Sequence, residues 1–136
     1  MCIRKLFIKN MIAVIVTLLC LQPVIAANNN GAEEAKKCLS LVRIDNIDVI
    51  DNQNIVFHTT GEQDYLNTLP YACSGLYQDK AIMYKTSLSE LCDLDVITVL
   101  DSIGMGYQSG ATCGLGKFKP VSKNEIKMLK EKHKQG

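Results

Sequence analysis

The stretch Leu39–Thr59, LSLVRIDNIDVIDNQNIVFHT, contains two apolar segments separated by a polar one. The first segment ends at Ile50 and the second begins at Ile55, and both are rich in the β-branched and aromatic residues that favour strands. Between them lie Asp51–Asn54, whose side chains can hydrogen-bond to nearby backbone groups and therefore favour turns. The stretch predicts a β-hairpin with a four-residue connection.

Further apolar segments bounded by turn-forming residues follow the hairpin. We expect additional strands at Tyr65–Leu69, Ala81–Lys85, Asp95–Ile103 and Leu115–Val121. A single helical turn is expected over Leu88–Cys92, because Ser87 and Glu90 have the spacing of a capping box. This pattern predicts a mainly β fold, namely a small antiparallel barrel or sandwich of about six strands.

A lysine-rich segment ends the chain. Ser122 and Glu125 again have capping-box spacing, and they predict a short C-terminal helix that continues to about Lys134. Residues 117–136 contain seven lysines and two acids. We interpret this segment as a solvated helix. The alternative is that it binds an anionic surface, either lipid headgroups of the cell envelope or the acidic body of the protein itself.

The amino-terminal segment has the three parts of a secretory signal. Its first ten residues include three basic residues and no acid, and an apolar run follows over Met11–Leu21. The small residue Ala26 stands before the expected cleavage point. A retained membrane anchor is the alternative, but it would need about 20 apolar residues. Met11–Ala27 approaches that length only if Gln22 and Pro23 are counted. We therefore predict cleavage after residue 26 and a periplasmic or secreted protein.

Four segments follow from these boundaries. Residues 1–26 are the signal peptide, 27–37 a flexible leader, 38–121 the β domain and 122–136 the lysine-rich helix or tail. Removing residues 1–26 from the 136-residue chain leaves 110 residues, which suits one domain with a modest core. Residues 27–116 contain five basic and twelve acidic residues, so the charge pattern does not indicate a nucleic-acid-binding protein.

Cysteines are the expected reinforcement of that core. Cys38, Cys73, Cys92 and Cys113 remain after the signal, an even number in an exported chain. This count predicts two disulfide bonds, with three connectivities open. No C-x-x-C pair occurs among them, so neither a zinc site nor a thioredoxin-like redox site is indicated.

A glycine-rich segment after the Asp95–Ile103 strand contains Gly104, Gly106, Tyr107 and Gly110. A dinucleotide-binding loop would require a helix immediately after the glycines, and residues 111–116 are poor helix formers. We therefore interpret Gly104–Gly110 as a flexible hairpin loop and as a candidate binding loop. No cofactor is expected.

His58 is a weak candidate for a catalytic residue. It lies in a predicted strand, and Asp48, Asp51 or Asp64 could partner it as a general base. An ordinary strand histidine is the favoured interpretation. Asp93 and Asp95 are similarly interpreted as turn residues, because a calcium loop needs more oxygen ligands at fixed spacing. No metal site is expected.

Several segments together resemble a known family. These are Cys38–Leu41, Ile47–Phe57, Tyr65–Pro70, Cys73–Leu76, Tyr84–Ser87, Leu91–Cys92, Asp95–Ile97 and Cys113–Phe118. The series is similar to domain of unknown function 6491, a bacterial family of small exported proteins, over about Cys38 to Val121. The resemblance implies a small secreted β domain and brings no activity, ligand or catalytic residue. It places the lysine-rich end beyond the family's usual limit.

The resemblance also implies a disulfide pairing. Shorter chains of this kind keep only the cysteines that match Cys73 and Cys113, so these two are expected to pair, which leaves Cys38 with Cys92.

Three functions remain open from the sequence. We favour a non-enzymatic binding or accessory domain, because no nucleophile–base pair or metal set is recognisable. An inhibitor of a cationic secreted hydrolase, such as a lysozyme, is the second hypothesis, since the acidic body could attract a cationic protein. A small hydrolase that uses His58 is the third.

Overall fold

The computed structural model describes residues 34–61, 63–86 and 88–134. The chain divides into two units, residues 1–31 and 32–136, and the described residues all lie in the second. The expected signal peptide and most of the expected leader fall outside the described residues. Lys36, which was assigned to the leader, pairs with Phe118, so ordered pairing begins before Cys38.

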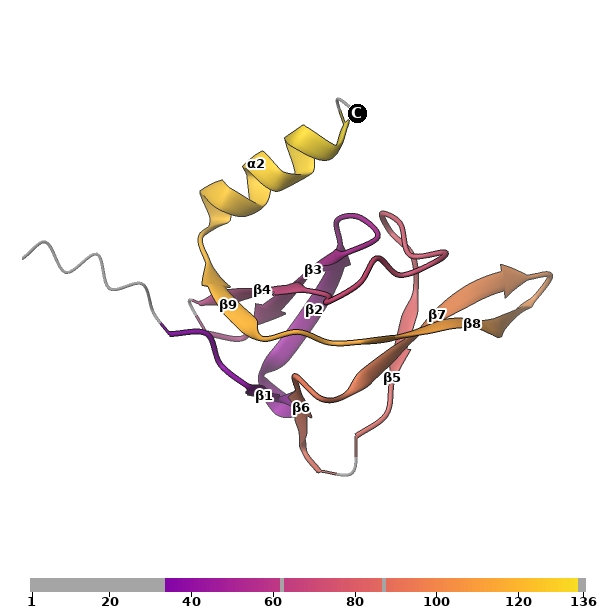
Figure 1. Cartoon of the computed structure of the whole chain (residues 1–136), viewed down its shortest axis with the longest axis horizontal. Helices are drawn as coiled ribbons and strands as arrows, with labels where there is room; N and C mark the ends of the chain where they lie inside the picture. Colours follow the sequence, from indigo (N-terminus) through magenta and orange to yellow (C-terminus); the bar gives the residue numbers. More distant parts are fainter. Residues whose placement is uncertain (1–33, 62, 87, 135–136) are drawn as a thin grey trace, which may run out of the picture. The chain divides into compact units, whose positions relative to one another are not determined.

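The described residues contain nine strands, one 3₁₀ turn and one α-helix, joined by turns and loops (Figure 1). The strands are β1 (Cys38–Ser40), β2 (Ile44–Val49), β3 (Asn54–Thr59), β4 (Asp64–Thr68), β5 (Ile82–Tyr84), β6 (Glu90–Cys92), β7 (Val96–Ile103), β8 (Gly106–Gly114) and β9 (Phe118–Val121). The 3₁₀ turn is η1 (Leu41–Arg43), and the helix is α2 (Lys123–Lys134).

The strands form three antiparallel sheets. Their orders are β2-β3-β4-β9, β5-β7-β8 and β1-β6. Within the described residues no sheet closes on itself, so the mainly β, antiparallel prediction is confirmed in its sandwich-like form and not as a barrel. Nine strands are present where about six were expected, because the short strands β1 and β6 pair with each other and because β8 pairs with β7.

The hairpin predicted from Leu39–Thr59 is present as β2 and β3. Residues 50–53 connect the two strands, which matches the predicted four-residue connection. The Asp51 carboxylate holds this turn, since its Oδ1 accepts hydrogen bonds from the backbone N–H groups of Gln53 and Asn54, both at 2.8 Å.

The two faces of β3 pack against different clusters. Ile55 and Phe57 face the main core, whereas Val56, between them, faces the side covered by α2. This alternation is the normal consequence of strand geometry. Phe57 meets Phe118 of β9 edge to face, with ring centroids 5.3 Å apart and planes at 82°. The four-stranded sheet therefore has its main core on one face and the helix on the other.

The capping box before α2 is confirmed. The backbone N–H of Ser122 donates to Glu125 Oε2 at 2.8 Å, and the N–H of Glu125 donates back to Ser122 Oγ at 3.3 Å. Lys130 of the helix donates to Asp48 of β2 at 2.7 Å, so one lysine of the basic segment contacts the acidic body. Neither η1 nor α2 has the length and apolar character that a membrane-crossing helix requires.

Both expected disulfides are present. Cys38 on β1 is bonded to Cys92 on β6, and these two residues also face each other in the strand register. Cys73, in the loop after β4, is bonded to Cys113 on β8. This is the pairing that the family resemblance implied.

Three local predictions are wrong. Leu88–Cys92 is not a helical turn, because Glu90–Cys92 pairs with β1 as a strand; Ser87 of the expected cap lies outside the described residues. Gly104–Gly110 is not a long loop, because β8 begins at Gly106 and only residues 104 and 105 connect it to β7. The last strand begins at Phe118 and not at Leu115.

Candidate functional site

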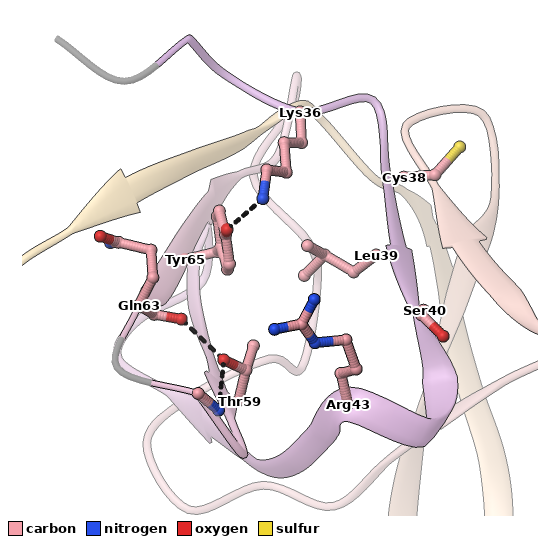
Figure 2. A pocket seen from close by; sticks show the side chains of 9 residues that line it. Lys36, Cys38, Leu39, Ser40, Arg43, Thr59, Gln63 and Tyr65 are labelled. Carbon is pink, nitrogen blue, oxygen red and sulfur yellow. Dashed lines mark hydrogen bonds between the residues drawn. The ribbon is translucent and has the colours of Figure 1, made fainter. Parts of the chain in front are cut away.

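A polar cavity of about 190 Å³ lies beside β1, η1 and the β3–β4 turn (Figure 2). It is lined by Lys36, Cys38, Leu39, Ser40, Arg43, Thr59, Gly61, Gln63 and Tyr65. Figure 2 shows the ends of Lys36 and Arg43 entering the cavity from opposite sides. The side chains of Cys38 and Ser40 point away from its centre. The cavity therefore has two cationic groups facing its interior.

Arg43 is positioned by the turn at the end of η1. Its backbone carbonyl accepts a hydrogen bond from the N–H of Thr60 at 2.9 Å, which joins η1 to the β3–β4 turn. Its guanidinium lies over Gly61, where a Cβ atom would be 3.4 Å from Nη2. A Cβ atom at position 61 would therefore be in van der Waals contact with the guanidinium.

Tyr65 forms a buried wall of the cavity. The residue lies on β4 and is 4% exposed. Its hydroxyl accepts a hydrogen bond from Lys36 Nζ at 2.5 Å, and the same ammonium group lies 4.9 Å from the ring centroid. Two backbone hydrogen bonds to Phe118, of 2.8 and 2.9 Å, fix the backbone of Lys36 beside β9.

The β3–β4 turn forms the floor between the two cations. Thr59 Oγ1 donates to the carbonyl of Gln63 at 2.8 Å and accepts from the N–H of Gly61 at 3.4 Å. Gln63 Nε2 donates to the carbonyl of Val121 at 3.2 Å, which ties the turn to β9. These bonds fix Thr59, Gly61 and Gln63 relative to one another and to β9.

The described residues that line the cavity include two cations, Lys36 and Arg43, and no acid. Arg43 makes no side-chain hydrogen bond or ion pair with any residue in the described ranges. A guanidinium offers planar, forked donors that match a carboxylate or phosphate. The arrangement can therefore bind an anion.

His58 lies outside this cavity, in a charged network on β2, β3 and β4. Its Nδ1 is 3.0 Å from Asp64 Oδ2, and its Nε2 is 3.2 Å from Asp48 Oδ2. The hydrogen bond from Lys130 is the main cause that lowers the pKa of Asp48; partial burial opposes this effect, and His58 adds to it. Asp48 and Asp64, two of the three carboxylates proposed as partners of His58, therefore lie beside it. Each of them contacts one ring nitrogen, so both nitrogens already have a carboxylate neighbour.

Of the remaining sequence candidates, only Cys38 lines the cavity, and its side chain points away from the cavity's centre (Figure 2). Gly104, Gly106, Tyr107 and Gly110 lie on or next to the β7–β8 hairpin, where Tyr107 is 69% exposed. Cys38 and Cys92 come close to Glu90, but their sulfur atoms are bonded to each other and offer no thiolate to a metal.

The sequence analysis missed Lys36, Arg43 and Tyr65. Tyr65 lies more than twenty residues after Lys36 and Arg43, and no recognisable motif relates the three. One signal was available: the chain has only two arginines, Arg4 and Arg43, and a lone arginine in an otherwise lysine-based domain merits attention.

Comparisons with known proteins give one match. A family model described as "Family of unknown function (DUF6491)" matches residues 8–136. No curated protein matches the chain, and no solved structure does. The match continues to residue 136, so the expectation that the lysine-rich end lies beyond the family's limit is wrong.

Proposed function

Because the chain belongs to DUF6491, a family of unknown function, its role has to be inferred from its own residues, and we propose that it is a non-enzymatic binding domain for a small organic carboxylate. The ligand would occupy the cavity beside β1, η1 and the β3–β4 turn, with its carboxylate on Arg43.

One observation carries this proposal: the Arg43 guanidinium faces a cavity whose described lining residues include no acid, and it has no side-chain partner among the described residues. Lys36 adds a second positive charge on the opposite side of the cavity (Figure 2). Hydrogen bonds between charged groups are about twice as strong as neutral ones, and guanidinium–carboxylate pairs are often bidentate. An anionic ligand would therefore gain most of its affinity from Arg43.

The cavity's size and walls restrict the ligand. A volume of 190 Å³ corresponds to roughly six molecules of liquid water at about 30 Å³ each. Leu39 and Tyr65 give it an apolar side, and both are buried. These features favour a short carboxylate with a few carbon atoms, such as butyrate, over a bare inorganic ion.

The geometry does not favour catalysis. A general base must present a free atom to the proton that it removes. Both ring nitrogens of His58 already lie within 3.2 Å of carboxylates. Ser40, a hydroxyl residue of the cavity lining, points away from the cavity's centre (Figure 2). The proposal is therefore a binding role.

We further propose that the domain works outside the cytoplasm, as a periplasmic or secreted protein freed from residues 1–26. Two disulfides support this placement, because disulfides persist in oxidising compartments. Cell fractionation together with amino-terminal sequencing of the native protein tests it. A cytoplasmic protein that keeps its first methionine would contradict the placement.

Isothermal titration calorimetry tests the ligand. Sodium butyrate should bind the oxidised protein, whereas sodium chloride at equal ionic strength and neutral butanol should give no comparable heat. Arg43→Gln should abolish butyrate binding, and Arg43→Lys should weaken it because the forked donors are lost. Lys85→Gln, which removes an exposed cation outside the cavity, is the matched control. Equal binding by Arg43→Gln and the unaltered protein would contradict the proposal.

Inhibition of a cationic hydrolase is the second candidate. It is favoured by the apolar side chains at the tip of the β7–β8 hairpin, where Ile103, Met105 and Tyr107 are 57%, 108% and 69% exposed. Exposed apolar groups that lie together often mark protein interaction sites. Lysozyme activity measured with micromolar protein tests this role. Full activity in its presence would exclude the lysozymes used.

A further inference from the structure

An apolar groove lies between α2 and the outer face of the four-stranded sheet, on the side away from the main core. The helix covers this face incompletely, because Ile126 is its only buried residue. Leu129 is partly buried against the small cluster of Ile50, Val56 and Val121. A narrow apolar stripe on one twelve-residue helix therefore leaves part of the sheet uncovered beside it.

The groove has a volume of about 250 Å³ and mostly apolar walls. Leu66, Pro120 and Val121 line it from the sheet, and Met128 and Leu129 line it from the helix. Met128 is 60% exposed, although it borders an apolar space that it could fill more completely. Methionine side chains are flexible and adapt to varied apolar ligands.

The groove is charged at its ends. Glu125, Met128, Leu129 and Lys132 all line it, and their spacing of three, four and seven residues places them along one face of α2. The acid therefore lies at the amino-terminal end of the groove and Lys132 at the other. Lys119, which faces Leu66 in the β4–β9 register, lines it from the sheet.

The charge of Glu125 is already engaged. Its Oε2 accepts hydrogen bonds from both the N–H and the Oγ of Ser122, at 2.8 Å each. The backbone hydrogen bond from Ser122 is the main cause that lowers the pKa of Glu125. The hydrogen bond from the Ser122 hydroxyl and the nearby charge of Lys119 lower it further. Lys132, by contrast, makes no side-chain hydrogen bond or ion pair within the described ranges. The vacant positive end of the groove is therefore the Lys132 end.

We infer that this groove binds a single-chain anionic amphiphile, namely a medium-length alkyl carboxylate. The alkyl chain lies along Leu66, Val121 and Met128, and the carboxylate lies at Lys132. A volume of 250 Å³ equals roughly eight molecules of liquid water at about 30 Å³ each. A methylene group is about as large as a water molecule, so a chain of eight to ten carbons would fill the groove.

This site is separate from the cavity at Arg43. The two share no lining residue, and the groove has the larger apolar surface. Decanoate, which is too long for the 190 Å³ cavity, is the probe that separates them.

The test is a titration of the oxidised, isotopically labelled protein with decanoate, monitored through the chemical shifts of its amide resonances. We expect saturable shifts at Leu66, Val121 and Leu129. Met128→Gln should weaken binding about tenfold, because it removes apolar contact from an exposed residue that is not needed for folding. Lys132→Gln should weaken it about threefold, in line with one exposed ion pair.

Three controls make the result decisive. Lys134→Gln removes an exposed lysine of the same helix that does not line the groove, and it should bind decanoate normally. Arg43→Gln should also bind normally, which would separate failure of the groove from failure of the Arg43 cavity. Decanol should bind more weakly than decanoate.

Three results would overturn the inference. The first is decanol binding as tightly as decanoate. The second is shifts centred on Thr59 and Tyr65, which would place decanoate in the other cavity. The third is binding to phosphatidylglycerol vesicles with no response to soluble decanoate, which would indicate a membrane surface as the partner.

Discussion

The side-chain amide of Asn67 forms two hydrogen bonds with the backbone of Gly116, although the two residues are 49 positions apart. Asn67 Nδ2 donates to the carbonyl of Gly116 at 2.6 Å, and its Oδ1 accepts from the N–H of Gly116 at 2.9 Å. Asn67 is fully buried on β4, and Gly116 lies in the connection between β8 and β9. One buried amide thus fixes the path of the chain between two sheets.

Replacing Asn67 with alanine should lower the free energy of unfolding by about 2–4 kcal/mol, because two buried backbone groups lose their partners. Urea unfolding followed by circular dichroism measures this change. Asn46→Ala is the matched control, since Asn46 is exposed and makes a single side-chain bond to Asp48. Equal, small effects of the two substitutions would contradict the structural role of Asn67.

Gly116 should tolerate no side chain. A Cβ atom there would lie 2.2 Å from the carbonyl oxygen of Thr68, whereas a Cβ at Gly114 would have nothing within 4 Å. Gly116→Ala should therefore destabilise the protein by more than about 2 kcal/mol, and Gly114→Ala should change its stability by under about 1 kcal/mol. Thermal unfolding of the two variants compares them directly. Similar melting temperatures would show that the backbone around Gly116 can shift.

The Lys130–Asp48 pair should make stability depend on pH. The carboxyl pKa of Asp48 is lowered from its usual 3.8, chiefly by the hydrogen bond from Lys130. A lowered pKa in the folded state adds stability above the unfolded value, and this stability is lost as pH falls through the folded value. Lys130→Met should therefore cost about 0.2–1 kcal/mol at pH 7, as expected for a partly exposed pair.

That cost should diminish as the pH falls below 3.8 and through the lower pKa that Asp48 has in the folded protein. Urea unfolding at pH 7 and at pH 2.5 measures both values. Lys127→Met is the control, because Lys127 makes only a 3.9 Å contact with exposed Glu131. A cost for Lys130→Met that is the same at both pH values would show that packing, and not the ion pair, is responsible.

The two disulfides should each contribute substantially to stability. They close loops of 40 and 54 residues, so restriction of the unfolded chain predicts about 4 kcal/mol for each. Double replacement of Cys73 and Cys113 by alanine should lower the free energy of unfolding by that amount. Peptide mapping without reduction should recover Cys38 linked to Cys92. A Cys38–Cys73 peptide would contradict the fold.

Local chemistry made part of the fold predictable. The β2–β3 hairpin was predictable because Asp51 and its polar neighbours form a turn from their own side chains. The start of α2 was predictable for the same reason, since Ser122 and Glu125 cap it reciprocally. In both cases residues within four positions of one another determine the structure.

Pairing with another strand accounts for two of the elements that were mispredicted. Glu90–Cys92 is a strand because β1, more than fifty residues earlier, pairs with it and is bonded to it through Cys38. The glycine-rich sequence of Gly106–Gly114 favours a loop by itself, but β7 supplies hydrogen-bond partners along most of its length. The partner of Glu90–Cys92 is distant in the sequence, whereas β7, which was predicted as a strand, directly precedes β8.

The candidate site was not predictable for a similar reason. Arg43, Tyr65 and Lys36 meet only because β3 pairs with β4 and because Lys36 pairs with Phe118. His58 was easier to place, since its neighbour Asp48 lies on the adjoining strand of the predicted hairpin. A hairpin can be predicted from sequence, whereas a cavity lined by two separate stretches, residues 36–43 and 59–65, requires the structure.

The most direct test of the central claim is to map butyrate binding by amide chemical shifts in an isotopically labelled sample. The account predicts saturable shifts at Thr59, Gly61 and Tyr65, and it predicts that Arg43→Gln removes them. Shifts confined to the lysines of α2, or shifts unchanged by Arg43→Gln, would contradict it.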